Sequence, residues 1–347
     1  MTGVSLLGPW PGERVLEAQT TVLGELTAVP EGVRGLPSAV QLPARGPWAT
    51  SVARTAALLT DMPVEIGTHG WKLADRPGFD LERTSSLLRE DLDALAIAGH
   101  GYQGPLVVSV RGPWTLSAIL YLARGDRVLS DAGAARDVAA SLADGLGGLM
   151  ASLRTAVPGA RPVLVVREPM LPDVLSGTLA TFSGHGRLPA VPLDDAAAAL
   201  REVVDAARAA GVGEVVAHGG GRFASRALQA LARSGAESVG IAAGAVRGPQ
   251  WEQVAALVED GRRMWLGLPQ DRWKRPAGPQ QVADLITRPW TAVGLPARSL
   301  EDVVVHVETS GGLGGGDLLL SDTRDVRHAI GTSVRVAGIL AERADAG

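Results

Sequence analysis

Cysteine is absent from the 347 residues of the chain. Its absence excludes a disulfide framework, a cysteine nucleophile and any metal site that depends on thiolate ligands. Lysine is also scarce, because only Lys72 and Lys274 stand among the 33 basic residues. This scarcity indicates codon bias rather than a functional requirement.

A clustered excess of positive charge is missing as well. The formal net charge is −4, and charged residues make up 20% of the chain. Nucleic acids and anionic membranes both require a clustered basic surface, so neither is expected as a partner. The N-terminus lacks the features of a signal peptide, and no charge-free apolar run is long enough to span a bilayer. We therefore expect a cytoplasmic protein.

What the chain does contain is a regular alternation of two patterns. Short apolar runs, typical of buried strands, alternate with Ala- and Leu-rich segments of helical periodicity. Eight such units predict a parallel sheet with crossover helices, and their number favours a closed (β/α)₈ TIM barrel, one domain over residues 1–347. The predicted strands are Val4–Leu7, Pro63–Ile66, Leu106–Val110, Pro162–Val166, Glu214–Ala217, Ser238–Ile241, Met264–Leu268 and Asp302–Val307. The predicted helices include Thr115–Ala123, Asp131–Val157, Asp194–Ala210, Arg222–Ser234, Pro249–Asp260, Pro279–Val293 and Arg324–Arg343.

The segment Glu13–Trp48 is longer than one crossover needs, and much of it is rich in proline and glycine. We expect an elaborated loop over one end of the barrel.

His218 ends the fifth predicted strand and is followed by three glycines, in the sequence GVGEVVAHGGG. Glycine lets the backbone turn sharply or come close to a ligand. The carboxyl ends of the strands are where TIM barrels place their chemistry. His218 is therefore a candidate catalytic residue; the alternative is a histidine that is hydrogen-bonded inside the barrel without a role in binding.

Several motifs, in order along nearly the whole chain, carry a family resemblance: LLGPWPGERVLEA, LPARG, GWKLADRPG, VRGPWTL, VVREPMLPDVL, AHGGG and ETSGGLGGG. The chain resembles the C-terminal catalytic barrel of cobalamin-independent methionine synthase, in particular its short single-barrel homologues, within the UROD/MetE-like superfamily. The resemblance implies a methyltransferase barrel. In that family, zinc held by one His, two Cys and a Glu binds homocysteine as its thiolate, and the methyl donor is a folate.

The same resemblance implies that the zinc site is degenerate. The family's histidine ligand falls on His218, but its two cysteines fall on Gly220 and near Gly311, and its glutamate falls near Ala242. A single imidazole is far short of the ligands that zinc requires. Zinc is therefore not expected, and no other cofactor is implied, although a folate-like ligand is possible.

The substrate positions of the family are changed too. Its Asp-Glu-Pro reads Arg167, Glu168, Pro169, and its substrate-holding serine is replaced by Pro9. An acidic residue expected after the second strand falls around Trp71, on a loose alignment.

Polar residues after the predicted strands are the remaining candidates for the mouth of the barrel, by which we mean its C-terminal end. Glu168 is a second candidate catalytic residue, with a strand-end ion pair to Arg167 or Arg111 as the alternative. Two guanidiniums aimed into one mouth would favour a carboxylate or phosphate ligand, whereas outward-pointing ones would form salt bridges. The candidate ligand-binding residues are Arg111, Arg167, His69, Glu308 and Arg275. Arg275 lies in a basic and aromatic segment, for which the alternative interpretation is a solvated surface loop without a ligand.

The best-supported function is thus a methionine synthase-like protein of the methyltransferase family that binds a small carboxylated or folate-like anion and has lost zinc-dependent homocysteine methylation. One alternative is a non-catalytic binding or regulatory scaffold. Another is a diverged enzyme of the uroporphyrinogen-decarboxylase type, which would hold several carboxylates with arginines. Inward-pointing arginines favour an anion site, and a collapsed apolar mouth favours the scaffold.

Overall fold

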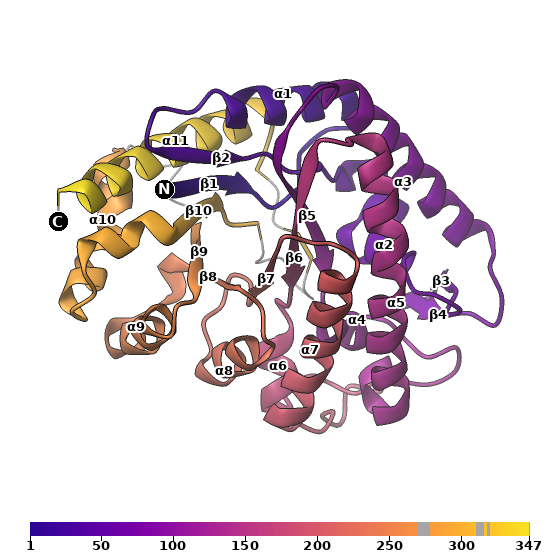
Figure 1. Ribbon diagram of the computed structural model, residues 1–347. Coiled ribbons are helices and arrows are strands. Elements are labelled where there is room, and N and C mark those ends of the chain that lie inside the picture. The colour runs from indigo at the N-terminus through magenta and orange to yellow at the C-terminus, as the bar shows by residue number, and fades with distance from the viewer. Residues whose placement is uncertain (270–277, 310–315, 318–319, 347) are drawn as a thin grey trace.

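The computed structural model describes residues 1–269, 278–309, 316–317 and 320–346. Eight parallel strands form a nearly closed barrel with interleaved helices, which confirms the predicted (β/α)₈ class (Figure 1). The strands follow one another in the order β2-β1-β10-β9-β8-β7-β6-β5 around the sheet. Their bounds are β1 Thr2–Leu6, β2 Val33–Leu36, β5 Gly104–Arg111, β6 Ala160–Arg167, β7 Glu214–His218, β8 Ser238–Ala242, β9 Arg263–Leu268 and β10 Val303–Val307.

Helices surround the barrel, and three shorter ones follow strands at the mouth. The outer helices are α1 Val15–Thr27, α3 Phe79–Ala98, α5 Ala132–Ala156, α7 Leu193–Ala209, α8 Ser225–Arg233, α9 Trp251–Glu259, α10 Pro279–Ala292 and α11 Thr323–Asp345. The shorter ones are α2 Ser51–Ala56, α4 Pro113–Ile119 and α6 Leu171–Ser176. The predicted helices are all present, with ends that shift by a few residues. Within the described residues, no helix is both long and apolar enough to cross a bilayer.

The second strand was predicted in the wrong place. The barrel strand is β2, Val33–Leu36, inside the segment Glu13–Trp48 that was expected to be a loop, and α1 lies in that segment too. Its sequence VRGL has apolar side chains only at its two ends. Gly35 is needed where the backbone packs against the carbonyl of Leu26, because a Cβ there would overlap that oxygen. The predicted strand Pro63–Ile66 instead forms part of an outer hairpin, β3 Val64–Gly67 and β4 Gly70–Leu73.

The barrel closes weakly between β2 and β5. These strands share no continuous ladder; the contact is a single bridge between Ser38 and Val107. Two backbone hydrogen bonds of 2.8 Å make it, from Ala39 to the carbonyl of Val107 and from Val107 to the carbonyl of Pro37.

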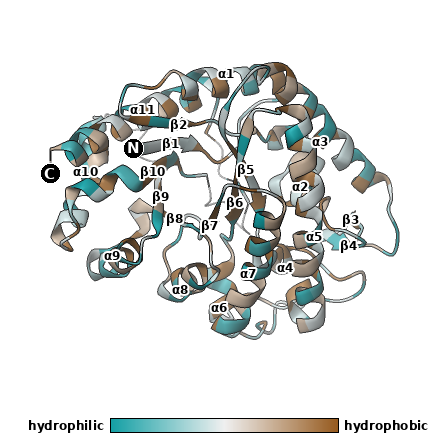
Figure 2. Ribbon diagram, viewed as in Figure 1, coloured by the Kyte–Doolittle hydropathy of each residue, from teal (hydrophilic) through white to brown (hydrophobic). Residues whose placement is uncertain are grey.

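Alternate residues of each strand face the barrel interior, as the period of two in a strand requires. One buried cluster fills this interior, whereas a second, larger one lies between strands and outer helices. The hydropathy colouring shows the same arrangement, with apolar strands inside helices whose outer faces are polar (Figure 2). The inner cluster consists of Leu7, Leu36, Val107, Val163, Val165, Val216, Trp265 and Val304.

Candidate functional site at the barrel mouth

The polar residues of the mouth are the last inward-facing positions of their strands. On β6, Val163 and Val165 lie in the inner cluster, so Arg167 faces inward as well. The same alternation runs from Val216 to His218 on β7. It also places Arg111, His306 and Glu308 inside, two or four residues beyond inward-facing valines. Strand parity therefore brings Arg111, Arg167, His218, His306 and Glu308 to one end of the barrel interior.

Strand register places three of these residues in one row. Arg111 pairs with Arg167 across β5 and β6, and Arg167 pairs with His218 across β6 and β7. All three are fully buried. The row continues to Gly240 on β8.

Two glycines on the intervening strands make room for the larger side chains. A Cβ on Gly240 would overlap the ring of His218, and a Cβ on Gly267 would overlap the carboxylate of Glu308. Any larger residue on β8 or β9 at these positions would therefore displace the polar groups of the mouth.

Arg111 and Arg167 converge on one carboxylate, that of Asp317. Nη2 of Arg111 lies 2.8 Å and Nη1 of Arg167 lies 2.9 Å from the same oxygen, Oδ1. The other oxygen accepts a hydrogen bond of 2.6 Å from Ser51, whose hydroxyl in turn accepts one from Nε of Arg111. Arg167 also donates to the hydroxyl of Thr309. The two arginines therefore point into a common space, and an internal carboxylate fills it.

Burial and charge act in opposite directions in this cluster. Burial lowers the pKa of Arg111 to about 10, with Asp317 opposing the shift, so the guanidinium stays charged near neutral pH. Burial acts to raise the pKa of Asp317, but the guanidiniums of Arg111 and Arg167 outweigh it and hold the pKa below its usual value. Within the described part of the chain, Nη1 of Arg111 has no hydrogen-bond partner. Such a buried donor costs free energy unless another acceptor reaches it.

His218 and His306 form a hydrogen-bonded pair across the barrel. Their Nε2 atoms lie 3.1 Å apart. Nδ1 of His218 accepts a hydrogen bond from the amide of Gly220, and Nδ1 of His306 lies 3.2 Å from the carbonyl of Val307. The pattern that satisfies every atom has His218 donating from Nε2 to Nε2 of His306, with both rings neutral.

The surroundings keep the pair neutral. Burial lowers the pKa of His218 well below its usual value, and His306 and the arginines lower it further. Burial also lowers the pKa of His306, to about 3. Oε2 of Glu308 lies 3.6 Å from Nε2 of His218. Both rings are therefore uncharged near neutral pH, and the proton on Nε2 of His218 is directed at Nε2 of His306.

The resemblance to a zinc family raises the question of whether these residues fit the metal. His218, His306 and Glu308 each offer one ligand atom, all within 4.8 Å of one another. Zinc would need the lone pairs of both Nε2 atoms. However, Nδ1 of His218 accepts the amide proton of Gly220, so the ring proton stays on Nε2. A metal-ligating histidine normally donates from its other nitrogen instead. In this arrangement the proton on Nε2 of His218 occupies the position where zinc would need a lone pair.

Glu168, predicted as catalytic, faces away from the barrel interior. It follows the inward-facing Arg167, so strand parity turns it towards α4. Its carboxylate accepts hydrogen bonds from the amides of Trp114 and Thr115, at 2.9 and 2.7 Å, and from the hydroxyl of Thr115. Burial raises the pKa of Glu168 to about 7, although these hydrogen bonds lower it. Its geometry is that of a residue that holds the first turn of α4.

Two further predicted residues lie away from this cluster. His69 is exposed at the turn between β3 and β4. Its ring contacts are with Tyr121 and Phe182, the latter edge-to-face at 4.7 Å between centroids. Arg275 lies outside the described residues.

The sequence argument missed His306, Asp317, Ser51 and Thr309. A signal for His306 was present, because the run VVVHVE places it two residues before Glu308 and therefore on the same face. Asp317 carries no comparable signal, since it follows a glycine-rich stretch of sequence that has no fixed period.

Comparisons with known proteins bear on the fold. No protein-family model matches the sequence, and no curated protein is similar to it. Among solved structures, a B12-independent methionine synthase from Shewanella sp. W3-18-1 in complex with selenomethionine gives a TM-score of 0.60 at 12% identity, over 99% of both chains. GH5_18 from Streptomyces cattleya in complex with GlcNAc gives a TM-score of 0.49 at 17% identity, over 99% of this chain and 80% of that one. The first likeness shows a shared fold, and the second is too low to support an argument.

Proposed function

We propose that this barrel binds a small carboxylated ligand at its mouth, through Arg111 and Arg167. The observation that carries the proposal is the convergence of two buried guanidiniums on a single carboxylate oxygen of Asp317. Paired arginines recognise carboxylates well because their donors match the two oxygens. A ligand carboxylate would take the place of Asp317 and use the same donors, Arg111, Arg167 and Ser51.

The fold supports a methionine synthase-like, methyltransferase-type origin for this site. The structural neighbour from Shewanella holds selenomethionine, itself a small carboxylated molecule. We extend only the ligand class to this chain: an amino acid or a folate-like acid. His218 and His306 lie beside Glu308 at the same end of the barrel, so these are the groups to test for a catalytic role.

We further propose that zinc-dependent methylation of homocysteine is lost. A free alkyl thiol has a pKa near ~8.5, so only a few per cent is thiolate at neutral pH without a Lewis acid. Arginines and a neutral imidazole replace the metal here. We expect no methionine formation from homocysteine and methylated folate by the purified protein, with or without added zinc. Turnover typical of methyltransferases, or one zinc per chain that is lost in His218→Ala, would contradict this.

One observation favours a second candidate, a non-catalytic scaffold. The mouth cluster consists of Arg111, Arg167, His218, His306, Glu308 and Asp317. Its side chains are almost completely buried, and Asp317 already contacts both guanidiniums. In that case the arginines and Asp317 serve only to hold the barrel end together.

Chemical rescue separates the two candidates. Asp317→Gly removes the internal carboxylate, and acetate is the probe, with sodium chloride at equal ionic strength as control. If the arginines recognise carboxylates, acetate raises the melting temperature of the variant; at 100 times its dissociation constant a ligand stabilises by about 2.7 kcal/mol. Asp317→Gly combined with Arg111→Met should lose the effect.

The wild-type protein completes the test. Binding of small carboxylates to wild-type protein, weaker than to Asp317→Gly, supports a ligand site. Rescue of the variant with no binding to wild type supports the scaffold. No acetate effect on either protein overturns carboxylate recognition at the mouth.

A further inference from the structure

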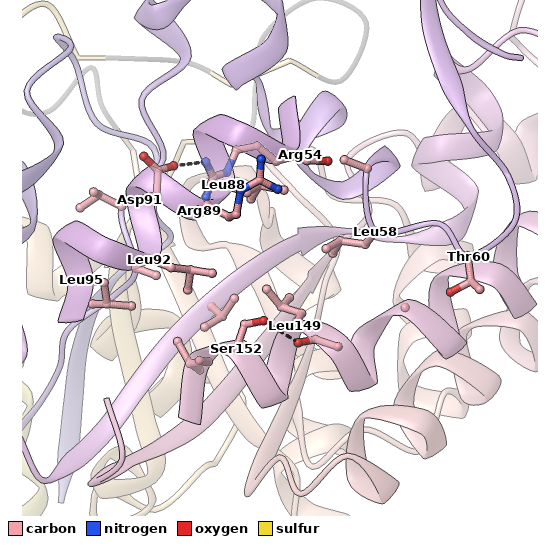
Figure 3. Close-up of a pocket in the computed structure, with 18 of the residues that line it drawn as sticks. Arg54, Leu58, Thr60, Leu88, Arg89, Asp91, Leu92, Leu95, Leu149 and Ser152 are labelled. Carbon is pink, nitrogen blue, oxygen red and sulfur yellow. Dashed lines mark hydrogen bonds and ion pairs between the residues drawn. The ribbon is translucent and has the colours of Figure 1, made fainter. Parts of the chain in front are cut away.

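A cavity of about 480 Å³ lies outside the barrel, between α2, α3 and α5 (Figure 3). None of its lining residues belongs to the mouth cluster. Its floor reaches the barrel wall at Val40 and Val108, beside the weak closure between β2 and β5. The size is in the range of small-molecule sites, roughly 300–1,000 Å³.

Most residues that line the cavity are apolar. The lining comes from α1, α2, α3, α5, β5 and the segments 39–40 and 57–60, and several of its residues are only partly buried. A ligand that covers such apolar surface gains about 25 cal/mol of binding free energy for each Å² that it removes from water. The leucines that line it are Leu58, Leu88, Leu92, Leu95, Leu149 and Leu153.

One of the residues that line the cavity is a glycine inside a helix. Gly148 lies inside α5 and lines the cavity, and a Cβ built on it would meet nothing within 4 Å. Glycine inside a helix costs about 1 kcal/mol relative to alanine. No steric contact requires glycine here, in contrast to Gly145, whose Cβ would overlap the carbonyl of Leu58.

Guanidiniums gather on the α2–α3 side of the cavity. Arg54 and Arg45 share the buried carboxylate of Asp91, and Glu90 lies 3.4 Å from Arg45. Arg89 lines the cavity too and is exposed, and none of the ion pairs found among the described residues involves it. Figure 3 shows Arg54 and Arg89 on the side opposite Leu149 and Ser152 of α5. Positive charge is thus in excess on this side by one guanidinium, and Asp144 of α5 adds one exposed carboxylate to the lining.

We propose that this cavity binds an amphipathic monocarboxylate, with its carboxylate on Arg89 and its hydrocarbon against the leucines. The site is independent of the function proposed for the mouth. A single apolar chamber with an available cation at its rim matches one charged head and one apolar tail.

The test uses decanoate below its micelle concentration, measured by titration calorimetry on the full chain. We expect one binding site per chain. Acetate, which lacks the tail, and decanol, which lacks the charge, should each bind at least about tenfold more weakly, a difference of about 1.4 kcal/mol. Equal binding of decanol and decanoate would overturn the role of Arg89.

Matched variants locate the site. Gly148→Leu should fill the opening and abolish binding, whereas Gly147→Leu, at an equally open helical position that does not line the cavity, should not. Arg89→Gln should weaken decanoate about tenfold, and Arg83→Gln, on the same helix but outside the lining, should not. Both Leu variants gain helix propensity, so folding is not at risk. Binding that is unchanged in Gly148→Leu, or lowered equally in each matched pair, overturns the proposal.

Discussion

Two places in this molecule are built from the same ion-pair unit, in which two guanidiniums share one aspartate. At the mouth, Arg111 and Arg167 hold Asp317. On the outer wall, Arg45 and Arg54 hold Asp91. In the mouth the arginine side chains are at most 1% exposed, whereas those on the outer wall are 9% and 11% exposed.

The difference comes from the elements that carry the arginines. Arg111 and Arg167 end neighbouring strands and face inward, so the barrel surrounds them on all sides. Arg45 and Arg54 lie on short helices outside the barrel, next to a cavity that borders the weak closure of the sheet. The same ion-pair unit is therefore fully enclosed at the mouth but lies beside a cavity on the outer wall. We expect the burial of the arginines, rather than the pairing itself, to decide how much free energy of unfolding is lost when each aspartate is removed.

Removal of each aspartate gives the largest effect that we expect. Asp317→Ala leaves two fully buried guanidiniums without their carboxylate, and breaking a buried pair in this way costs about 3–5 kcal/mol. Asp91→Ala should cost less, about 1–3 kcal/mol, because Arg45 keeps Glu90 and Arg54 can turn towards the cavity. Urea unfolding of both variants measures the two losses. Equal losses would show that burial does not distinguish the two units.

Much of this comparison could be predicted from the sequence, but not all of it. The convergence of Arg111 and Arg167 follows from two strands that end in arginine, since parallel strands bring their carboxyl ends together. Their partner was not predictable, because the sequence around Asp317 has no periodic pattern. Glu168 was assigned to the mouth because it follows a predicted strand, as Arg167 does. Strand parity sends the two in opposite directions, and register must be known before parity can be used.

The β2 region shows a second limit of the sequence argument. VRGL has neither the apolar run nor the alternation of a strand, and a close backbone contact requires one of its four residues, Gly35, to be glycine. The outer cavity lies beside this region, where pairing is reduced to one bridge. Such a gap depends on how three helices pack over a weak closure, which no local pattern specifies.

A smaller effect concerns pH, and it should arise at the mouth. The pKa of His306 is about 3 in the folded protein and near ~6.5 when unfolded, and that of His218 is also lowered, so the unfolded chain binds these protons first. Stability is therefore lost as pH falls below about 6.5. Glu168 acts oppositely, because its folded pKa of about 7 exceeds the unfolded value. Between about pH 6.5 and 4.5 the unfolded chain binds two more protons at the histidines and one fewer at Glu168. The net difference is one proton, so the free energy of unfolding falls by about 1.4 kcal/mol per pH unit.

His306→Gln tests this assignment. The amide can still accept the hydrogen bond from His218, but it no longer titrates, so the contribution of the mouth between pH 6.5 and 5 should become nearly flat. Urea unfolding at pH 7, 6 and 5 measures the slope, with the exposed His100→Gln as control. An unchanged slope in His306→Gln would show that this histidine is not neutral in the folded protein.

The smallest effect should come from the wall of the outer cavity, and it should be a gain. Gly148→Ala adds a Cβ into open space inside α5, so it should stabilise the protein by about 0.5–1 kcal/mol through helix propensity. Gly147→Ala should give the same gain, because its surroundings are equally open. Neither should change the pH slope, because neither position lies in the mouth cluster.

Of these two glycines, only Gly148 lines the cavity. Equal gains in stability, combined with weaker decanoate binding in Gly148→Ala alone, would mean that this glycine is kept for access of the ligand at the expense of stability. Equal gains with equal decanoate binding would show that a methyl group leaves the opening wide enough, and a loss of stability in Gly148→Ala would show that the cavity is narrower in solution.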